Sequence, residues 1–299
     1  METKLKGVIP PIITPLTEKE ELDREGLEKM VDYLIDGGVH GLFALGSTGE
    51  FAALDETIHA ETVKVIVEHT AGRVPVLVGV TGVGTKQTIA NLKRAEDLGA
   101  DGVVISPGYY FPYTQAELLH HYDLVCRQTN IPIMLYNVPV RARSPIHLET
   151  VKALAQYDQI IGIKDSSGSF NFVQELIGAA ETLPNFAVFQ GDEQAMGAAV
   201  LLGADGIVPG IGNLDPARCV QLYNAAVAGN KDEVNRLQRE INDVCRVFSL
   251  SQGSPYGGLK AALHMLGLCE PYPAKPAASP SAEQLKEIEA LLTEKGLLN

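Results

Sequence analysis

Short apolar runs alternate with longer amphipathic segments along most of this chain, and this alternation constrains the fold more than any other feature. Eight runs have the length and apolar character of buried strands: residues 7–13, 39–45, 74–80, 102–106, 131–136, 159–163, 186–190 and 206–208. Segments with helical periodicity follow them: residues 24–36, 55–69, 85–98, 115–128, 147–155, 170–181, 194–202 and 216–228. Asp23 is expected to cap the first of these helices. Strands that alternate with helices usually pair in parallel, so the pattern predicts an α/β fold.

A repeated junction indicates how these units close. GVHG at 38–41 and GADG at 99–102 and 203–206 each end a helix with glycine and open an apolar strand. Eight strand–helix units are the number that closes a ring, so we predict a (β/α)8 TIM barrel. A doubly wound open sheet is the alternative, and it is disfavoured because no GxGxxG motif follows the first strand.

The strand pattern stops near residue 230. Apolar residues at helical spacing then recur at 234–248, 259–266 and 282–292, and a Pro-rich link spans 271–280. We therefore predict a catalytic barrel domain at 1–229 and a C-terminal helical domain at 230–299. We expect the second domain to act in packing or assembly.

The composition excludes several classes of protein. A formal charge of -13 argues against a nucleic-acid partner, because binding phosphates requires a basic face. Four scattered cysteines form no CxxC pair, so neither a zinc site nor a disulfide framework is predicted. Without an apolar run of about 20 residues or a signal-peptide core, we expect no membrane association and a cytoplasmic location.

Lys164 is the candidate nucleophile. It directly follows the apolar run at 159–163, at the carboxyl end of a predicted buried strand. Burial disfavours the charged form of an amine, and a lysine that forms a Schiff base must react as the free amine. The alternative is a solvated lysine that ends a strand.

Further polar residues follow the other strands, where the active residues of a barrel gather. GSTGE at 46–50 combines flexible glycines, amides and two hydroxyls, which suits a carboxylate. An aromatic loop at 106–113 and YNVP at 136–139 come next, and a tyrosine at a strand end can move protons. Asp192 and Glu193 are expected to cap a helix start, with a role in substrate binding as the alternative.

This set of residues favours carbonyl chemistry through an imine. It contains a strand-end lysine, two tyrosines and a hydroxyl-bearing loop, while the chain has no HExxH, P-loop or GxSxG motif. We therefore expect no metal and no other cofactor. A barrel that only binds a keto acid is the alternative from another class of protein.

Three motifs carry a resemblance to a known family. GSTGE at 46–50, YNVP at 136–139 and GIKDSSG at 162–168 resemble, in order and spacing, the dihydrodipicolinate synthase / N-acetylneuraminate lyase family along essentially the whole chain. The resemblance implies a (β/α)8 barrel with a C-terminal helical domain, usually in a homotetramer. It also implies a class I aldolase mechanism that uses pyruvate.

The resemblance also implies a role for each matching residue. Lys164 would form the imine with pyruvate, and Tyr136 would transfer protons together with Ser47 and a Tyr110 that reaches in from a neighbouring subunit. Four further residues are implied in substrate binding: Thr48 and Gly49 for the pyruvate carboxylate, the Val208 backbone for the same pocket, and Arg141 for the carboxylate of an aldehyde.

The aldehyde partner stays open at this point. Arg141 favours a 4-hydroxy-tetrahydrodipicolinate synthase, which joins pyruvate to aspartate semialdehyde in the lysine and diaminopimelate pathway. Other positions depart from the synthase pattern: Ala142-Arg143 stands where Thr-Gly is usual, and SPYGGLK at 254–260 stands where an NPxPxK-like segment is common. A 2-keto-3-deoxy sugar acid aldolase or an N-acetylneuraminate lyase is the alternative.

Overall fold

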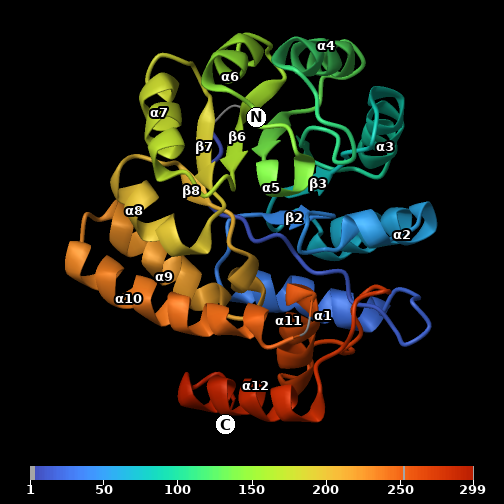
Figure 1. Cartoon of the computed structure of the whole chain (residues 1–299), viewed down its shortest axis with the longest axis vertical. Coiled ribbons are helices and arrows are strands. Elements are labelled where there is room, and N and C mark those ends of the chain that lie inside the picture. Colours follow the sequence, from blue (N-terminus) through green and yellow to red (C-terminus); the bar gives the residue numbers. More distant parts are fainter. Residues whose placement is uncertain (1–3, 252, 299) are drawn as a thin grey trace.

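Eight parallel strands form one sheet in the part of the chain that the structure describes. The computed structural model describes residues 4–251 and 253–298. The sheet order is β1-β8-β7-β6-β5-β4-β3-β2. Hydrogen bonds join its two ends, because the Phe43 amide donates to the Pro10 carbonyl and the Phe43 carbonyl accepts from the Ile12 amide, both at 3.0 Å. The predicted (β/α)8 barrel is therefore confirmed (Figure 1).

Seven of the eight strands are shorter than predicted, because only the hydrogen-bonded centre of each apolar run is regular. Their bounds are β1 (Gly7–Val8), β2 (Leu42–Ala44), β3 (Val76–Gly79), β4 (Gly102–Ile105), β5 (Ile133–Asn137), β6 (Ile160–Asp165), β7 (Ala187–Gln190) and β8 (Gly206–Ile207). Strands β5 and β6 run beyond their predicted ends, β5 by one residue and β6 by two. Lys164 therefore lies within β6 and not after it.

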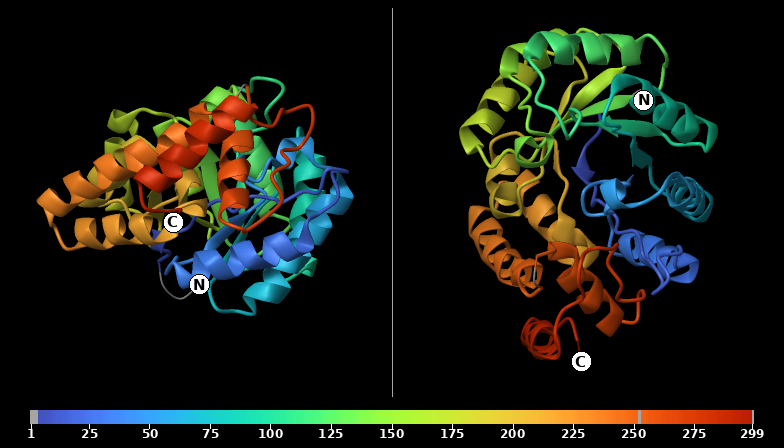
Figure 2. Two further views of the ribbon diagram at one scale, coloured as in Figure 1. Left: turned by 90° about the horizontal axis from the view of Figure 1, so that it is seen from below. Right: turned by 45° about the vertical axis from the view of Figure 1, so that its right-hand side comes forward.

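Helices lie outside the strands, as both views of Figure 2 show. Those of the barrel are α1 (Arg24–Asp36), α2 (Glu56–Thr70), α3 (Thr85–Asp97), α4 (Gln115–Cys126), α5 (Pro139–Ala142), α6 (Leu148–Leu154), α7 (Phe170–Ala180), α8 (Met196–Leu201) and α9 (Pro216–Val227). Asp23 caps α1 by accepting from the Gly26 amide, as predicted. Sequence analysis missed α5, a single helical turn that starts at Pro139. None of the described helices combines the length and the apolar character needed to cross a bilayer.

The C-terminal region contains α10 (Lys231–Val244), α11 (Pro255–Met265) and α12 (Ala282–Glu294), and the 3-10 turn η4 (Cys245–Ser249) lies between α10 and α11. Three further 3-10 turns belong to the barrel: η1 (Phe51–Ala53), η2 (Glu193–Ala195) and η3 (Gly210–Asn213). Figure 1 shows α10 alongside α9, and α12 at the outer end of the molecule. Apolar residues of α10 and α11 belong to the same core as the helices of the barrel. The division at residues 229 and 230 stays a prediction.

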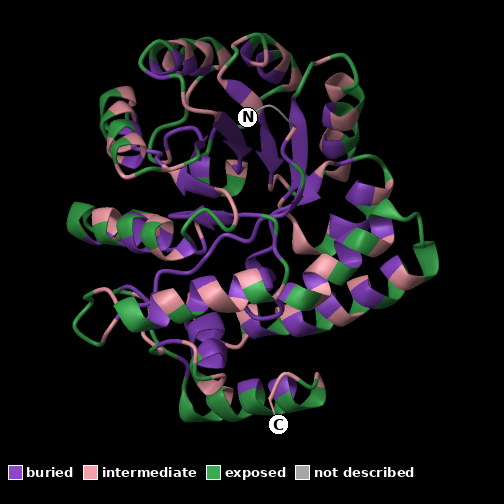
Figure 3. Ribbon diagram, turned by 180° about the vertical axis from the view of Figure 1, so that it is seen from behind, coloured by how far each residue is buried: buried purple, intermediate pink, exposed green. Residues whose placement is uncertain are grey.

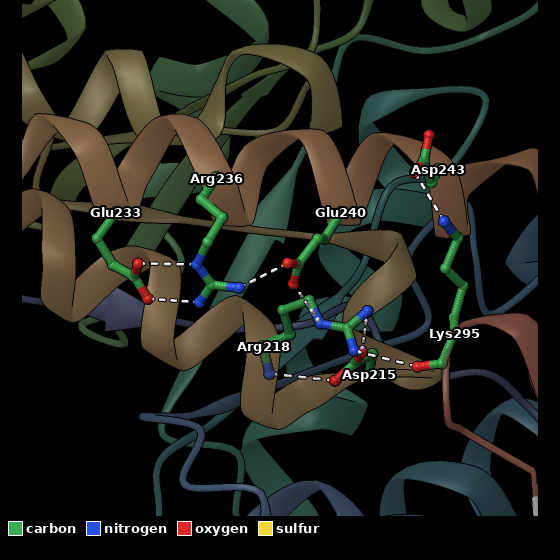
Figure 4. A network of polar contacts seen from close by, with 7 residues as sticks. All are labelled: Asp215, Arg218, Glu233, Arg236, Glu240, Asp243 and Lys295. Atoms are coloured by element: carbon green, nitrogen blue, oxygen red, sulfur yellow. Dashed lines mark hydrogen bonds and ion pairs between the residues drawn. The ribbon is translucent and has the colours of Figure 1, made fainter.

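Ion pairs connect this region to the barrel (Figure 4). Arg218 of α9 contacts Asp215 at 3.0 Å and Glu240 of α10 at 3.5 Å. Lys295, just after α12, contacts Asp243 of α10 at 2.7 Å. The interactions tie together helices that are distant in sequence.

Two apolar layers make up the core. One lies between the strands and the helices, and the other fills the interior of the barrel with Phe43, Leu77, Val104, Met134 and Phe189, among others. Successive side chains of a strand point to opposite faces, so each strand contributes to both layers. Figure 3 shows the strands buried, whereas the helices carry exposed stripes. Side chains at the carboxyl ends of the strands are then free to form a site.

Candidate active site

A cavity of about 580 Å³ lies at the carboxyl ends of the strands. Its walls are largely apolar, but they carry hydroxyl groups and one guanidinium, from Ser47, Thr81, Ser106, Tyr109, Tyr136, Ser254, Tyr256 and Arg141. A pocket with apolar walls and a few converging polar groups is typical of a small-molecule site. Among the described residues, no group of three or more His, Cys, Asp or Glu side chains could hold a metal ion.

Lys164 and Tyr136 lie side by side near the carboxyl ends of two neighbouring strands. They are paired residues in the register of β5 and β6. The Lys164 Nζ lies 4.1 Å from the centre of the Tyr136 ring and 5.1 Å from the centre of the Phe43 ring. Lys164 is buried and is not part of the cavity lining, whereas both rings line the cavity. The amine therefore lies against two aromatic side chains of the cavity wall, and its reaction with a small ketone stays a prediction.

The surroundings of Tyr136 favour its phenolate. Burial opposes ionisation, but the nearby Lys164 charge and hydrogen bonds with Ser166, Ser47 and Lys164 outweigh it, so the pKa of Tyr136 lies below its ordinary value. A phenol with a lowered pKa exchanges protons more readily near neutral pH. The arrangement fits the predicted role in proton transfer.

The ends of β5 and β6 are fixed by a second pair in the same register. The Asn137 Nδ2 donates to the Asp165 Oδ1 at 2.6 Å, and the Asn137 Oδ1 accepts from the Ile146 amide at 3.0 Å. The Asp165 Oδ2 accepts from the Ser167 hydroxyl at 2.8 Å. Burial raises the pKa of Asp165, although these hydrogen bonds oppose the shift. The pair locks the strand ends from which Tyr136 and Lys164 project.

Gly191 leaves the space that the lysine chain occupies. A Cβ at this position would lie 2.8 Å from the Lys164 Cε and would overlap the Ser166 Oγ. The sequence pattern of segment 191–193 indicates a role for its two acids but not for its glycine. Only the packing of β7 against β6 makes the requirement visible.

The GSTGE loop is divided between two environments. Ser47 and Glu50 line the cavity, whereas the buried Thr48 and Gly49 lie outside its lining. The Gly49 carbonyl accepts from the Thr14 hydroxyl at 2.8 Å. The structure therefore brings Ser47 to the Tyr136 hydroxyl, and the predicted contacts of Thr48 and Gly49 with a carboxylate stay predictions.

Glu50 connects this loop to the C-terminal region. Its Oε2 lies 2.5 Å from the Lys260 Nζ of α11, and both side chains are buried. Its Oε1 accepts from the Ala274 amide at 3.0 Å, while the Lys260 Nζ donates to the Tyr272 carbonyl at 3.0 Å. Burial lowers the pKa of Lys260, and the attraction of Glu50 opposes that shift. The pair joins the loop to the segment that forms one wall of the cavity.

Residues after β7 and β8 lie outside the cavity lining. The buried Val208 belongs to the barrel interior together with Tyr136 and lies outside the cavity lining, and its amide donates to the Gln190 carbonyl at 2.8 Å. Asp192 caps η2 by accepting from the Gln194 amide, as predicted. Glu193 accepts from the Gly210 amide at 2.8 Å, and burial raises the pKa of Glu193. The role of Val208 in the pocket stays a prediction.

Tyr110 lies away from the cavity within its own chain. It is 66% exposed and packs edge to face on Phe111, which is 58% exposed. Its neighbour Tyr109 lines the cavity and packs on Phe51. The exposure of Tyr110 is compatible with a contribution to the site of a second copy, which stays a prediction.

The C-terminal region supplies one wall of the cavity. Residues 253, 254 and 256 and residues 274–278 are part of the lining, as is Arg141 on the turn of α5. Arg141 is exposed at the mouth and donates from Nη2 to the Tyr256 hydroxyl at 3.1 Å. This region therefore contributes to the cavity wall, which its sequence pattern did not indicate, and its expected role in packing or assembly stays a prediction. Nothing in the local sequence reveals a contact between residues 115 positions apart.

Comparisons with known proteins agree with this geometry. The model of the family described as "Dihydrodipicolinate synthetase family" matches residues 4–295. A 4-hydroxy-tetrahydrodipicolinate synthase of Methanothermobacter thermautotrophicus is 31% identical over 92% of this chain and 98% of its own. The structure of a dihydrodipicolinate synthase from Bacteroides thetaiotaomicron has a TM-score of 0.94 at 37% identity and covers 98% of this chain and 100% of its own. A prophage protein of Escherichia coli K12, solved in complex with pyruvate, has a TM-score of 0.93 at 30% identity, with coverages of 98% and 99%.

Proposed function

The chain belongs to the dihydrodipicolinate synthetase family, whose members are lyases and synthases of the class I aldolase type, and we propose that Lys164 forms the imine with pyruvate. The observation that carries the proposal is the position of Lys164, whose Nζ lies 4.1 Å from the centre of the Tyr136 ring, a side chain that lines the cavity. A buried amine beside a phenol with a lowered pKa supplies both the nucleophile and the proton carrier.

The chemistry proceeds in four steps. The free amine of Lys164 adds to the C2 carbonyl of pyruvate and loses water to give a protonated imine. The methyl group gives up a proton through Tyr136, and the resulting enamine attacks the aldehyde carbon. The new alkoxide takes a proton back through the same tyrosine, assisted by Ser47 and by Tyr110 of a second copy. Water, or an amino group of the product itself, then attacks the imine carbon and releases the lysine.

We further propose that the aldehyde is aspartate semialdehyde, which makes the enzyme a 4-hydroxy-tetrahydrodipicolinate synthase of lysine and diaminopimelate biosynthesis. Arg141 at the mouth of the cavity supports this choice, because a guanidinium binds a carboxylate well. Thr48, the Gly49 amide and the Val208 backbone would hold the pyruvate end. No external cofactor takes part in the scheme.

A second candidate is cleavage of a 2-keto-3-deoxy sugar acid or of N-acetylneuraminate. The hydroxyl groups of Thr81, Ser106 and Ser254 in the cavity wall favour it, since they can pair with the hydroxyls of a sugar chain. We also propose that the protein forms a homotetramer, which the exposed Tyr110 and Phe111 support, and that it is cytoplasmic. Sedimentation analysis of the wild type tests the assembly, and the turnover of Tyr110→Phe tests the part of the hydroxyl in proton transfer.

Borohydride trapping tests the imine. The enzyme is treated with borohydride in the presence of pyruvate, and intact mass and peptide mapping locate the adduct. We expect one stable adduct at Lys164, none in Lys164→Arg, and an unchanged adduct in Lys152→Arg at the surface. An adduct elsewhere, or none, would overturn the proposal. Turnover of sugar acids but not of aspartate semialdehyde would instead leave the imine and remove the synthase.

A further inference from the structure

Tyr256 forms a pair with Arg141 at the mouth of the cavity, and the proposed function gives Arg141 a role but leaves Tyr256 without one. Arg141 lies on the turn of α5 and Tyr256 on the first turn of α11. The Arg141 Nη2 donates to the Tyr256 hydroxyl at 3.1 Å, and the guanidinium carbon lies 5.9 Å from the centre of the tyrosine ring. Both side chains line the cavity.

The pair presents positive charge that is not neutralised locally. Among the described residues, no carboxylate forms an ion pair with Arg141, which is exposed. The Arg141 guanidinium has five N–H donors, and among the described residues a single hydrogen bond, to Tyr256, uses them. The remaining donors are available to a ligand.

Tyr256 adds a neutral donor beside this charge. Burial raises the pKa of Tyr256 to about 12, so the hydroxyl keeps its proton at physiological pH. Its oxygen already accepts from Arg141, and no described residue accepts its proton. The hydroxyl can therefore donate to the same anion that Arg141 attracts.

The position of Tyr256 is fixed by the fold. Ser254 caps α11 and accepts from the Tyr256 amide at 3.4 Å, and Pro255 occupies the first turn. One turn further on, the buried Lys260 holds α11 to Glu50 of the GSTGE loop. A donor on a rigid helix start loses little freedom when a ligand binds.

We propose that Tyr256 is a specificity-determining residue that, with Arg141, clamps the anionic end of the aldehyde partner. The enzyme then prefers aldehydes with a carboxylate at the end remote from the carbonyl over neutral aldehydes. This inference rests on the proposed function, because it assigns one end of the substrate of the same site. It makes the SPYGGLK segment part of substrate recognition.

Steady-state kinetics with matched aldehydes test the clamp. Pyruvate is kept saturating while aspartate semialdehyde, succinic semialdehyde and the neutral glyceraldehyde are varied, for wild type and Tyr256→Phe. The substitution keeps the ring and removes only the hydroxyl. We expect KM to rise about tenfold for the two anionic aldehydes, the effect of losing one hydrogen bond to a charged group, with little change for glyceraldehyde. Tyr157→Phe is the matched control, because its hydroxyl donates to Asp123, which is not part of the cavity lining.

Arg141→Gln and the double variant show whether the two residues act together. If they hold one anion, the double variant loses less than the product of the single losses. Equal changes for anionic and neutral aldehydes, or an unchanged KM in Tyr256→Phe, would overturn the clamp. So would the absence of turnover of both anionic aldehydes by a wild-type enzyme that still traps pyruvate. Failure to trap pyruvate at Lys164 would refute the proposed function itself, so the two failures are distinguishable.

Discussion

Replacing Lys260 by methionine breaks the buried ion pair between α11 and the GSTGE loop. The methionine keeps most of the apolar stem of lysine and removes the charge. The lysine side chain is 0% exposed and that of Glu50 is 5% exposed, and their charged atoms lie 2.5 Å apart. The variant therefore leaves a buried carboxylate without its cation.

The expected loss of stability follows from this burial. Removing one partner of a buried ion pair costs about 3–5 kcal/mol, because the remaining charge stays desolvated. Unfolding entropy of about 2.1 cal/mol/K per residue gives, for the 299 residues of this chain, about 0.6 kcal/mol per degree. We expect the melting temperature to fall by about 5–8 °C.

Two further variants make the measurement specific. Glu50→Gln combined with Lys260→Met removes both charges and should recover most of the loss, since no unpaired charge remains. Lys152→Met breaks an exposed pair with Glu149 and should change stability by less than about 0.5 kcal/mol. Calorimetry and urea unfolding measure all three. A Lys260→Met variant as stable as wild type, or a double variant no better than the single one, would refute this reasoning.

Three shorter predictions concern the site and the pH response. Gly191→Ala should slow trapping of pyruvate about tenfold or more, because the added Cβ would displace the Lys164 side chain. Gly178→Ala is the control and should not slow trapping, since no heavy atom lies within 4 Å of its added Cβ. Equal trapping rates for the two variants would contradict the packing argument. Lys164→Met should raise the pKa of Tyr136, because burial then acts without the opposing cation. The ultraviolet absorbance of the phenolate measures this pKa. An unchanged titration would exclude the effect of the lysine charge. Burial lowers the pKa of His121 from 6.5 to about 4, so the unfolded chain binds a proton more readily than the folded chain. The free energy of unfolding therefore falls by up to about 3 kcal/mol as the pH drops from about 6.5 to about 4. In urea unfolding, His121→Gln should lose less stability with falling pH than the wild type. An equal pH dependence of the two proteins would refute this role of His121.

The sequence alone predicted the strand and helix order and the positions of Lys164 and Tyr136 at neighbouring strand ends. Both came from local patterns: apolar runs and helical periodicity reflect which faces are buried, and parallel strands present their carboxyl ends at one edge. The aspartate cap of α1 was predicted for the same reason, since a cap depends on residues three positions apart.

Only the tertiary structure decided which side chains meet. The register that pairs Tyr136 with Lys164 depends on how β5 and β6 align, and the need for Gly191 depends on the packing of β7. The contact of Arg141 with Tyr256 joins residues 115 positions apart, and that of Glu50 with Ala274 joins residues 224 positions apart. Local periodicity contains no information about such pairs, because their distance depends on the closure of the whole barrel and on the path of the chain after it. The strand pattern therefore predicts Tyr136 and Lys164, whereas the contacts that the C-terminal region makes in the cavity wall appear only in the folded molecule.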